Sequence, residues 1–318
     1  VASRMLQAIY CSRLGDAQGL LVAAQEAEAL LVTVDADDAP GWVGNRGLST
    51  GLRAVGELWC GRPRRAVELM ERSIVGQPLK VVGYSAVYWY GLIALAEASQ
   101  GFTGRAVELA ERALHEDAAG WTGGHEIAPA WLALATAALW RGEPARAQEY
   151  LDRGEDANAQ FNRTVALGFR LLAARIRLHA GELAAARQIL ADLEAMLVGV
   201  PPTSFVAASH QAALIDVELA SGALERAASL LVELEAGCAD AASDPAFDPG
   251  PIEALVAMRR TRILLASGQE TAVRAAVEPL LTVPGATSAQ AWLLVCLAED
   301  TLRHDAYASD ALARSLDA

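Results

Sequence analysis

The sequence predicts an all-α protein, an α-solenoid in which about eight helical hairpins stack into a right-handed superhelix. Two segments of the chain are similar copies of each other. Residues 61–74 read GRPRRAVELMERSI and residues 101–114 read GFTGRAVELAERAL, and eight of the fourteen positions are identical. Weaker copies follow other glycines. A period of roughly 20–50 residues indicates stacked supersecondary units. Successive glycines are 39 to 46 residues apart, at positions 15, 61, 101, 142, 181, 222 and 268.

Each repeat contains two stretches of helical length with a glycine between them. In the copy that begins at Gly101, apolar residues recur at positions 106, 109, 110 and 113, the i, i+3, i+4, i+7 spacing of an amphipathic helix. An apolar-rich stretch, YSAVYWYGLIALAEASQ at 84–100, precedes the glycine. Glycine at such a place is typical of a left-handed helix C-cap, because it has no Cβ to clash. Each unit is therefore predicted to be a helical hairpin.

We expect one domain over residues 1–318, which we interpret as part of a larger protein. The last hairpin lacks its glycine, so its register stays open, and the longest linker is expected at 236–251, AGCADAASDPAFDPGP. The hairpins are expected near residues 1–33, 43–74, 82–116, 125–160, 163–197, 204–235, 251–282 and 286–318.

Small residues recur at two places in the hairpin. The fifth residue after the glycine is alanine in five copies, and the residue seven before the glycine is alanine in five. We expect the paired helices to approach closely at these positions, since larger side chains would overpack the contact at a cost of roughly 1–3 kcal/mol. The two sets are Ala66, Ala106, Ala147, Ala186 and Ala227, and Ala8, Ala54, Ala94, Ala135 and Ala174.

Composition excludes several classes of protein. Apolar residues make up 53% of the chain, too many for a disordered protein. The formal net charge of −13 argues against binding of bare DNA or RNA, which needs clustered Lys and Arg. No apolar run approaches the roughly 18 residues of a membrane span. Four scattered cysteines, without a CxxC pair, predict neither disulfides nor a zinc site and fit a reducing cytoplasm.

The repeat pattern G-x-x-x-[R/A]-A, with a small residue seven before the glycine, resembles the tetratricopeptide repeat, at a period longer than usual. Two segments resemble the helical arm of the large ATP-binding LuxR-type regulators of bacteria, the MalT-like group. These are ELWCGRPRRAVELMERSI at 57–74 and WLLVCLAEDTLRHDAYASDALARSLDA at 292–318. The resemblance covers essentially the whole chain.

That resemblance implies a signal-sensing arm. Its concave groove would bind a small-molecule inducer or a regulatory protein, and self-association would be possible. An ATPase module upstream would bind ATP, and a C-terminal helix-turn-helix would bind DNA. This chain has no GxxxxGK[ST] motif, and its one lysine, Lys80, is not in one. We therefore expect no cofactor and no enzymatic activity in this segment itself.

Two other functions compete with this interpretation. A free-standing tetratricopeptide scaffold would bind peptide or protein partners without any DNA output. An α/α-toroid enzyme would need a closed ring with carboxylates on long loops at one rim, which short loops and alanine-rich hairpins disfavour. Sequence beyond both ends, with or without a P-loop and a helix-turn-helix, would separate the first two functions.

Metal-binding motifs are incomplete. HEIAP at 125–129 begins like a zinc-protease helix but has no second histidine at 129. Asp240, Asp244 and Asp248 are four residues apart, whereas an EF-hand needs a spacing of two, a glycine and a terminal glutamate. We expect no metal site and interpret the aspartates as a solvated linker.

Two groups of residues are candidates for ligand binding. Aromatic residues gather before Gly101 and Gly142, among them Tyr88, Trp89 and Trp140. Core packing is the ordinary interpretation; a stacking platform for a ligand is the functional one. The residue six before each glycine is expected to face the groove, which gives a stripe that is apolar first and charged later, with His179 nearby. Its members are Ile9, Val55, Leu95, Thr136, Arg175, Asp216 and Arg262.

Overall fold

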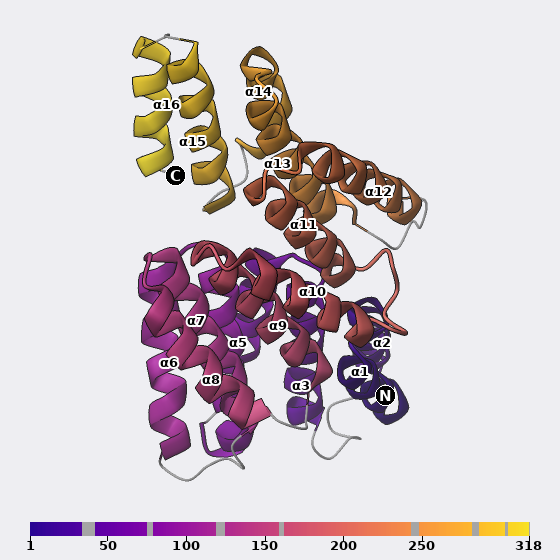
Figure 1. Ribbon diagram of the computed structural model, residues 1–318. Coiled ribbons are helices and arrows are strands. Elements are labelled where there is room, and N and C mark those ends of the chain that lie inside the picture. The colour runs from indigo at the N-terminus through magenta and orange to yellow at the C-terminus, as the bar shows by residue number, and fades with distance from the viewer. Residues whose placement is uncertain are drawn as a thin grey trace.

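The computed structural model describes residues 1–33, 42–74, 79–118, 125–158, 162–242, 248–281, 286–302 and 305–317. Over these ranges the chain is all-α, with no strand, and sixteen α-helices form eight successive hairpins (Figure 1). The fold class predicted from the repeat is confirmed. Among the helices of these ranges, none has both the length and the apolar character needed to cross a membrane.

The helices alternate between the first and the second member of each hairpin. The sixth hairpin is longer than expected, because its second helix continues beyond residue 235 into the predicted linker. The bounds are α1 Ala2–Leu14, α2 Ala17–Val32, α3 Trp42–Trp59, α4 Pro63–Ile74, α5 Leu79–Ser99, α6 Thr103–Ala118, α7 Ala128–Trp140, α8 Pro144–Asn158, α9 Arg163–His179, α10 Leu183–Met196, α11 Phe205–Ala220, α12 Leu224–Ala242, α13 Gly250–Ala266, α14 Glu270–Val277, α15 Ala286–Thr301 and α16 Asp305–Asp317.

The glycine turns share one geometry. All seven repeat glycines have positive φ, between 69° and 88°, the left-handed conformation that the sequence predicts. The next N–H donates to a carbonyl five residues back, as in Arg62 to Glu57, 2.9 Å, and Phe102 to Glu97, 3.0 Å. This is the six-to-one hydrogen bond of a Schellman motif. It ends the first helix of each hairpin and directs the chain back along it.

The recurring alanines are buried as expected. All five alanines that follow the glycines are fully buried, and the five that precede them are at most 2% exposed. Burial at these repeated positions is what close approach of the two helices requires.

A buried glutamate explains the arginine of the repeat. Arg65 and Arg105 lie four residues after the glycines of their repeats. Glu57 and Glu97 lie four residues before the same glycines. Arg65 pairs with Glu57 at 3.1 Å, and Arg105 pairs with Glu97 at 3.1 Å. Both glutamates are almost fully buried. The two most similar copies therefore share an ion pair that joins the two helices of their hairpin.

The superhelix returns to its start after four hairpins. The fifth hairpin lies against the first, where the Thr164 hydroxyl donates to the Ser12 carbonyl, 2.8 Å. The Arg163 guanidinium donates to the carbonyls of Leu14, 3.2 Å, and Val198, 2.7 Å. In Figure 1, α1 accordingly lies beside α9, and α11 to α16 rise above this lower body.

Candidate ligand-binding groove

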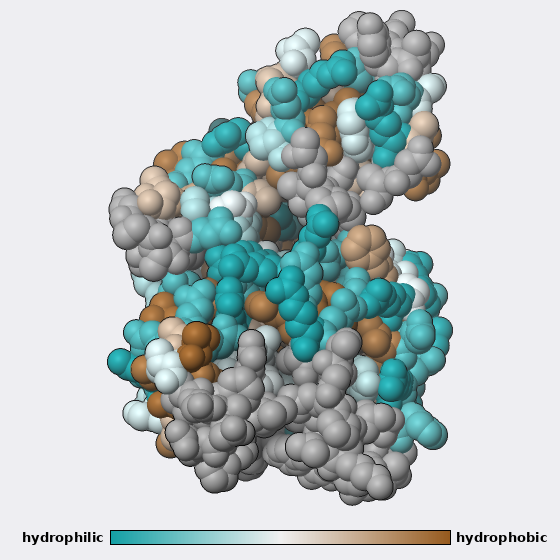
Figure 2. Space-filling view, turned by 180° about the vertical axis from the view of Figure 1, so that it is seen from behind, coloured by the Kyte–Doolittle hydropathy of each residue, from teal (hydrophilic) through white to brown (hydrophobic). Residues whose placement is uncertain are grey.

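A large groove runs along the inner side of the superhelix. Its volume is about 1380 Å³, and its wall comes mainly from the first helices of hairpins two to eight, α3 to α15 in steps of two. Seen from behind, the molecule has a notch between the C-terminal hairpins and the body below (Figure 2). The lining is mostly apolar, with charged side chains near Arg62, near Asp216 and, between apolar residues, at Glu253.

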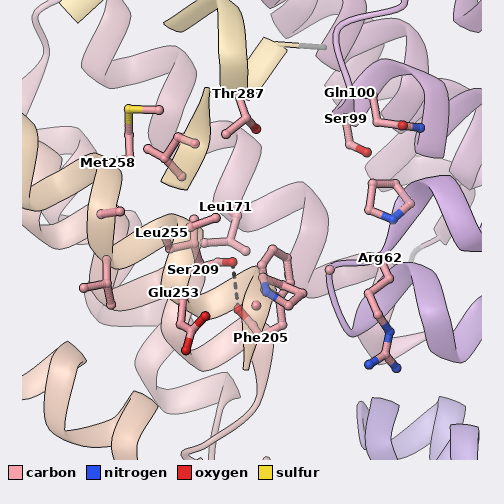
Figure 3. A pocket seen from close by; sticks show the side chains of 18 of the residues that line it. Arg62, Ser99, Gln100, Leu171, Phe205, Ser209, Glu253, Leu255, Met258 and Thr287 are labelled. Atoms are coloured by element: carbon pink, nitrogen blue, oxygen red, sulfur yellow. Dashed lines mark hydrogen bonds between the residues drawn. The ribbon is translucent and has the colours of Figure 1, made fainter. Parts of the chain in front are cut away.

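The apolar floor is built from successive inner helices. Leu132 of α7, Leu171 and Leu172 of α9, Phe205 of α11 and Leu255 of α13 line it. In the close view, Leu171, Leu255 and Phe205 lie near one another, with Arg62 across the groove from them (Figure 3). Such a floor can bury apolar side chains of a ligand, which is the main source of affinity in concave sites.

The turn of the second hairpin touches the far wall of the groove. A Cβ added at Gly61 would lie 2.6 Å from the Phe205 ring and 2.8 Å from the Cβ of Pro251. The neighbouring Arg62 reaches Asp248 at 3.5 Å. Only glycine fits this close approach, which narrows the groove between the second hairpin and the sixth and seventh.

Asp216 organises the charged region near the C-terminal hairpins. One carboxylate oxygen accepts from Arg259 at 2.7 Å, and the other accepts from Arg262 at 2.6 Å. Asp216 is buried, and the Arg262 side chain is 44% exposed. Because α11 supplies the carboxylate and α13 both guanidinium groups, this triad fixes the sixth hairpin against the seventh.

Arg175 of α9 lies beside this triad. Its guanidinium carbon is 5.8 Å from the centre of the Trp140 ring, within range of a cation–π contact. Among the described residues it forms no hydrogen bond or ion pair. The side chain is exposed to the groove, but the concave wall surrounds it, and this desolvation lowers its pKa, as do Arg259 and Arg262.

His179 lies one helical turn beyond Arg175 on α9. His179 is exposed at the surface, but partial desolvation lowers its pKa below the usual value near 6.5, and the charges of Arg175 and Arg262 lower it further. It does not line the groove itself. The structure therefore places Arg175, His179, Asp216 and Arg262 in one neighbourhood, as their repeated spacing suggests.

The aromatic candidates separate into two environments. Trp140 is half-buried and lines the groove. Trp89 is buried in the packing against α3, where a Cβ on Gly51 would be 2.5 Å from its ring. Tyr88 is half-buried, and its hydroxyl accepts a hydrogen bond from Asn162, 3.3 Å. Neither Tyr88 nor Trp89 lines the groove, because the face of α5 that bears them packs against neighbouring helices.

The predicted stripe follows the groove over part of its length. Leu95, Thr136, Arg175 and Asp216 line it, whereas Arg262, which pairs with Asp216, does not. Val55 is buried and Ile9 is half-buried, and neither lines the groove. The first hairpin contributes nothing to the wall, since the groove begins at the second.

Trp140, one of the predicted residues, belongs to a second stripe, two residues before the glycines, whose other members sequence reasoning missed. Trp59, Ser99 and Trp140 occupy this position on successive hairpins and line the groove. It lies four residues after the predicted stripe, one helical turn along the same face. Arg259, three residues before Arg262, was missed for the same reason. Extending the stripe by steps of three and four would have found all of them.

The metal candidates show no assembled site. Within the ranges that the structure describes, no three His, Cys, Asp or Glu side chains are arranged to hold a metal ion. Of the three aspartates considered above, Asp244 lies outside these ranges. Asp240 belongs to α12, so the segment around it is helical.

Known structures share this fold at low sequence identity. The apo form of the quorum sensor NprR from B. thuringiensis matches with a TM-score of 0.54 and 14% identity, over 99% of this chain and 86% of that one. A Rap protein complexed with competence and sporulation factor matches with a TM-score of 0.62 and 11% identity, over 99% of this chain and 96% of that one. No family model matches the chain, and no curated protein matches it. These likenesses establish a tetratricopeptide-like helical fold.

Proposed function

We propose that this chain is a signal-receiving module that binds an extended ligand, a peptide or an extended segment of a regulatory protein, in its groove. The observation that carries the proposal is the size and shape of the groove. Its volume of about 1380 Å³ exceeds the roughly 300–1,000 Å³ of a pocket for a drug-sized molecule. It also extends over seven hairpins, so a small-molecule inducer would touch only part of the wall.

The lining supports an extended occupant. Apolar side chains recur along the floor, and ionic groups lie near Arg62, near Asp216 and at Glu253. A peptide can place successive side chains along such a surface and be oriented by its charges. The likeness in fold to a quorum sensor and to a Rap protein complexed with a factor supports the same kind of role. Binding, without catalysis, is the activity we propose.

Peptide selection tests the proposal. The purified chain would be used to select from random twelve-residue peptides, and the enriched peptides would be synthesised and tested by thermal shift. A ligand at a hundredfold excess over Kd stabilises the folded state by about 2.7 kcal/mol. We expect enriched peptides that raise the melting temperature. A screen in which no peptide binds, or in which only sugars or small metabolites do, would contradict the proposal.

A matched pair of variants locates the site. Leu171→Glu adds a charge to the groove floor, and Val232→Glu adds the same charge to an exposed place on α12 outside the groove. We expect the first variant to weaken peptide binding at least tenfold and the second to leave it unchanged. Equal effects from both would place the peptide elsewhere.

The finer proposal is that this module serves a LuxR-type, MalT-like transcriptional regulator. It is supported by the resemblance of residues 57–74 and 292–318 to the helical arm of those proteins. The transcript that encodes the chain would decide. A P-loop upstream and a helix-turn-helix downstream in the same reading frame would support the regulator; their absence would favour the free-standing scaffold.

A further inference from the structure

Three arginines surround one carboxylate at the C-terminal part of the groove. Arg175 comes from α9, Asp216 from α11, and Arg259 and Arg262 from α13. Asp216 is the only described carboxylate that pairs with any of the three arginines. The cluster therefore carries an excess of two positive charges, in a chain whose overall charge is −13.

Of the acidic groups in the groove wall, Glu253 lies near Ser209 and Phe205, more than one helical turn from Arg259 along α13 (Figure 3). Two acidic groups of neighbouring helices are already engaged. Glu218, on α11, is held at two points by Arg187, at 3.1 and 3.2 Å. Glu235 pairs with Arg260 at 2.8 Å. Each oxygen of Asp216 already accepts from one arginine, so Asp216 has little capacity left for Arg175. The excess positive charge of the cluster thus has no ion-pair partner among the described residues other than Asp216.

Arg175 is positioned for a ligand. Trp140 holds one face of its guanidinium, while the side chain remains exposed to the groove. A guanidinium presents a planar fork of N–H donors that matches a carboxylate in geometry. Inside a concave wall its field is focused toward the opening, which favours an anionic partner. Arg259 of α13 also lines the groove and adds positive charge beside Arg175.

We infer that Arg175 binds a carboxylate of the ligand, with the positive charge of Arg259 beside it in the groove wall. This rests on the proposed function, because it names the chemistry of the same ligand. The carboxylate comes either from an Asp or Glu side chain or from the C-terminus of the peptide. Leu171 and Leu172 line the floor on the same helix, so the residue next to the carboxylate is expected to be apolar.

Peptides from the selection described above provide the test. Each would be made in its original form, with Asp and Glu replaced by Asn and Gln, and with its C-terminus amidated. Neutralising the responsible carboxylate is expected to weaken binding to the native chain at least tenfold. Which of the two changes is responsible identifies the source of the carboxylate.

The protein variants complete a double-mutant cycle. We expect the Arg175→Gln variant to bind the original peptide at least tenfold more weakly than the native chain does. For the neutralised peptide, we expect the variant and the native chain to have equal affinities. Arg170→Gln, on the same helix and outside the groove, is the control and should change neither. Circular dichroism would establish that both variants are folded.

The outcomes separate this inference from the proposed function. Peptides that bind in the groove but tolerate both neutralisation and Arg175→Gln would overturn the carboxylate site and leave the proposed function standing. If neutralisation weakens binding equally in the native chain and in Arg175→Gln, the carboxylate binds elsewhere and the inference is also wrong. A selection that yields no binding peptide would overturn both.

Discussion

Single residues explain why an arginine recurs after the glycines of the repeats. Glu97 is buried and is paired with Arg105, one of the arginines that recur after the glycines. A buried carboxylate is costly unless a partner compensates it, so the arginine and the glutamate depend on each other. Arg105 also pairs with Glu71 of the preceding hairpin. One arginine thus links both the two helices of its hairpin and two adjacent hairpins.

The protonation of Glu97 should be visible in the stability of the fold. Burial raises its pKa above the usual 4.5, although Arg105 opposes the shift. Because the folded state holds this proton more tightly than the unfolded chain, Glu97 makes the free energy of unfolding fall as pH rises from about 4.5 through the raised pKa.

We therefore expect the stability of the native chain, measured relative to Glu97→Gln by urea denaturation, to decrease over that range of pH. Glu108→Gln, at an exposed place on the same hairpin, is measured in the same way as the control for loss of a carboxylate. A difference between the native chain and Glu97→Gln that does not change with pH would contradict the expectation.

His179 reports the charge of the arginine cluster. Partial desolvation lowers its pKa, and Arg175 and Arg262 add repulsion. We expect Arg175→Gln to raise the pKa of His179 toward its usual value, measured by NMR titration of the imidazole signals. Arg170→Gln is the control and should not move it. An unchanged pKa in Arg175→Gln would mean that Arg175 does not act on this part of the groove.

At the scale of the helix pair, alanines set the distance between elements. Ala106 of α6 is fully buried at the repeated small position. A larger side chain there must either push α6 away from its neighbours or adopt a strained rotamer. The sequence pattern thus fixes how closely the helices of a hairpin pack, and through that the curvature of the whole array.

Replacing Ala106 tests that role. We expect Ala106→Leu to lower the free energy of unfolding by roughly 1–3 kcal/mol, measured by chemical denaturation. Glu108→Lys, an exposed charge reversal on the same helix, should cost much less. If the two variants were equally stable, the tight helix crossing would not be at position 106.

The glycine turns offer a comparison between a local and a long-range constraint. Gly61 and Gly142 both have positive φ, at 81° and 72°. A Cβ on Gly142 would meet nothing within 4 Å, whereas one on Gly61 would clash with Phe205 and Pro251. Alanine at either site should lower the free energy of unfolding by about 1 kcal/mol or more, because a residue with a Cβ is strained at positive φ. The loss should be larger at position 61 because of the clash.

We expect the difference between Gly61→Ala and Gly142→Ala to appear in the melting temperature and in the free energy of unfolding. The additional loss of stability in Gly61→Ala, compared with Gly142→Ala, measures how much the contact of the second hairpin with the sixth and seventh contributes. Equal losses would mean that this contact contributes nothing to stability in solution.

Across the whole molecule, the sequence predicted what is local and repeated. The glycine turns, the helix pairs and the buried alanines follow from short spacings that recur along the chain. The contact of the fifth hairpin with the first does not follow from these spacings, because it depends on Arg163 and Thr164, which belong to no repeat. The sequence pattern also could not show that Trp140 lines the groove and Trp89 does not. The curvature of the array decides which face of a helix reaches the groove.

The charged part of the candidate site was predictable only in outline. Arg175, Asp216 and Arg262 were found through one repeated position. The sequence does not show that Asp216 is shared by two arginines while Arg175 pairs with no described residue. That distinction comes from the distances between side chains on α9, α11 and α13, and it carries the inference about an acidic ligand.

The central claim is that an extended ligand lies along the inner helices. Hydrogen–deuterium exchange of the chain with and without a selected peptide tests it most directly, because it reports on every helix at once. The account predicts that the peptide slows exchange in the first helices of the hairpins, α5, α7, α9, α11 and α13, more than in the second helices α6, α8 and α10, which do not line the groove. Protection confined to those second helices would contradict it.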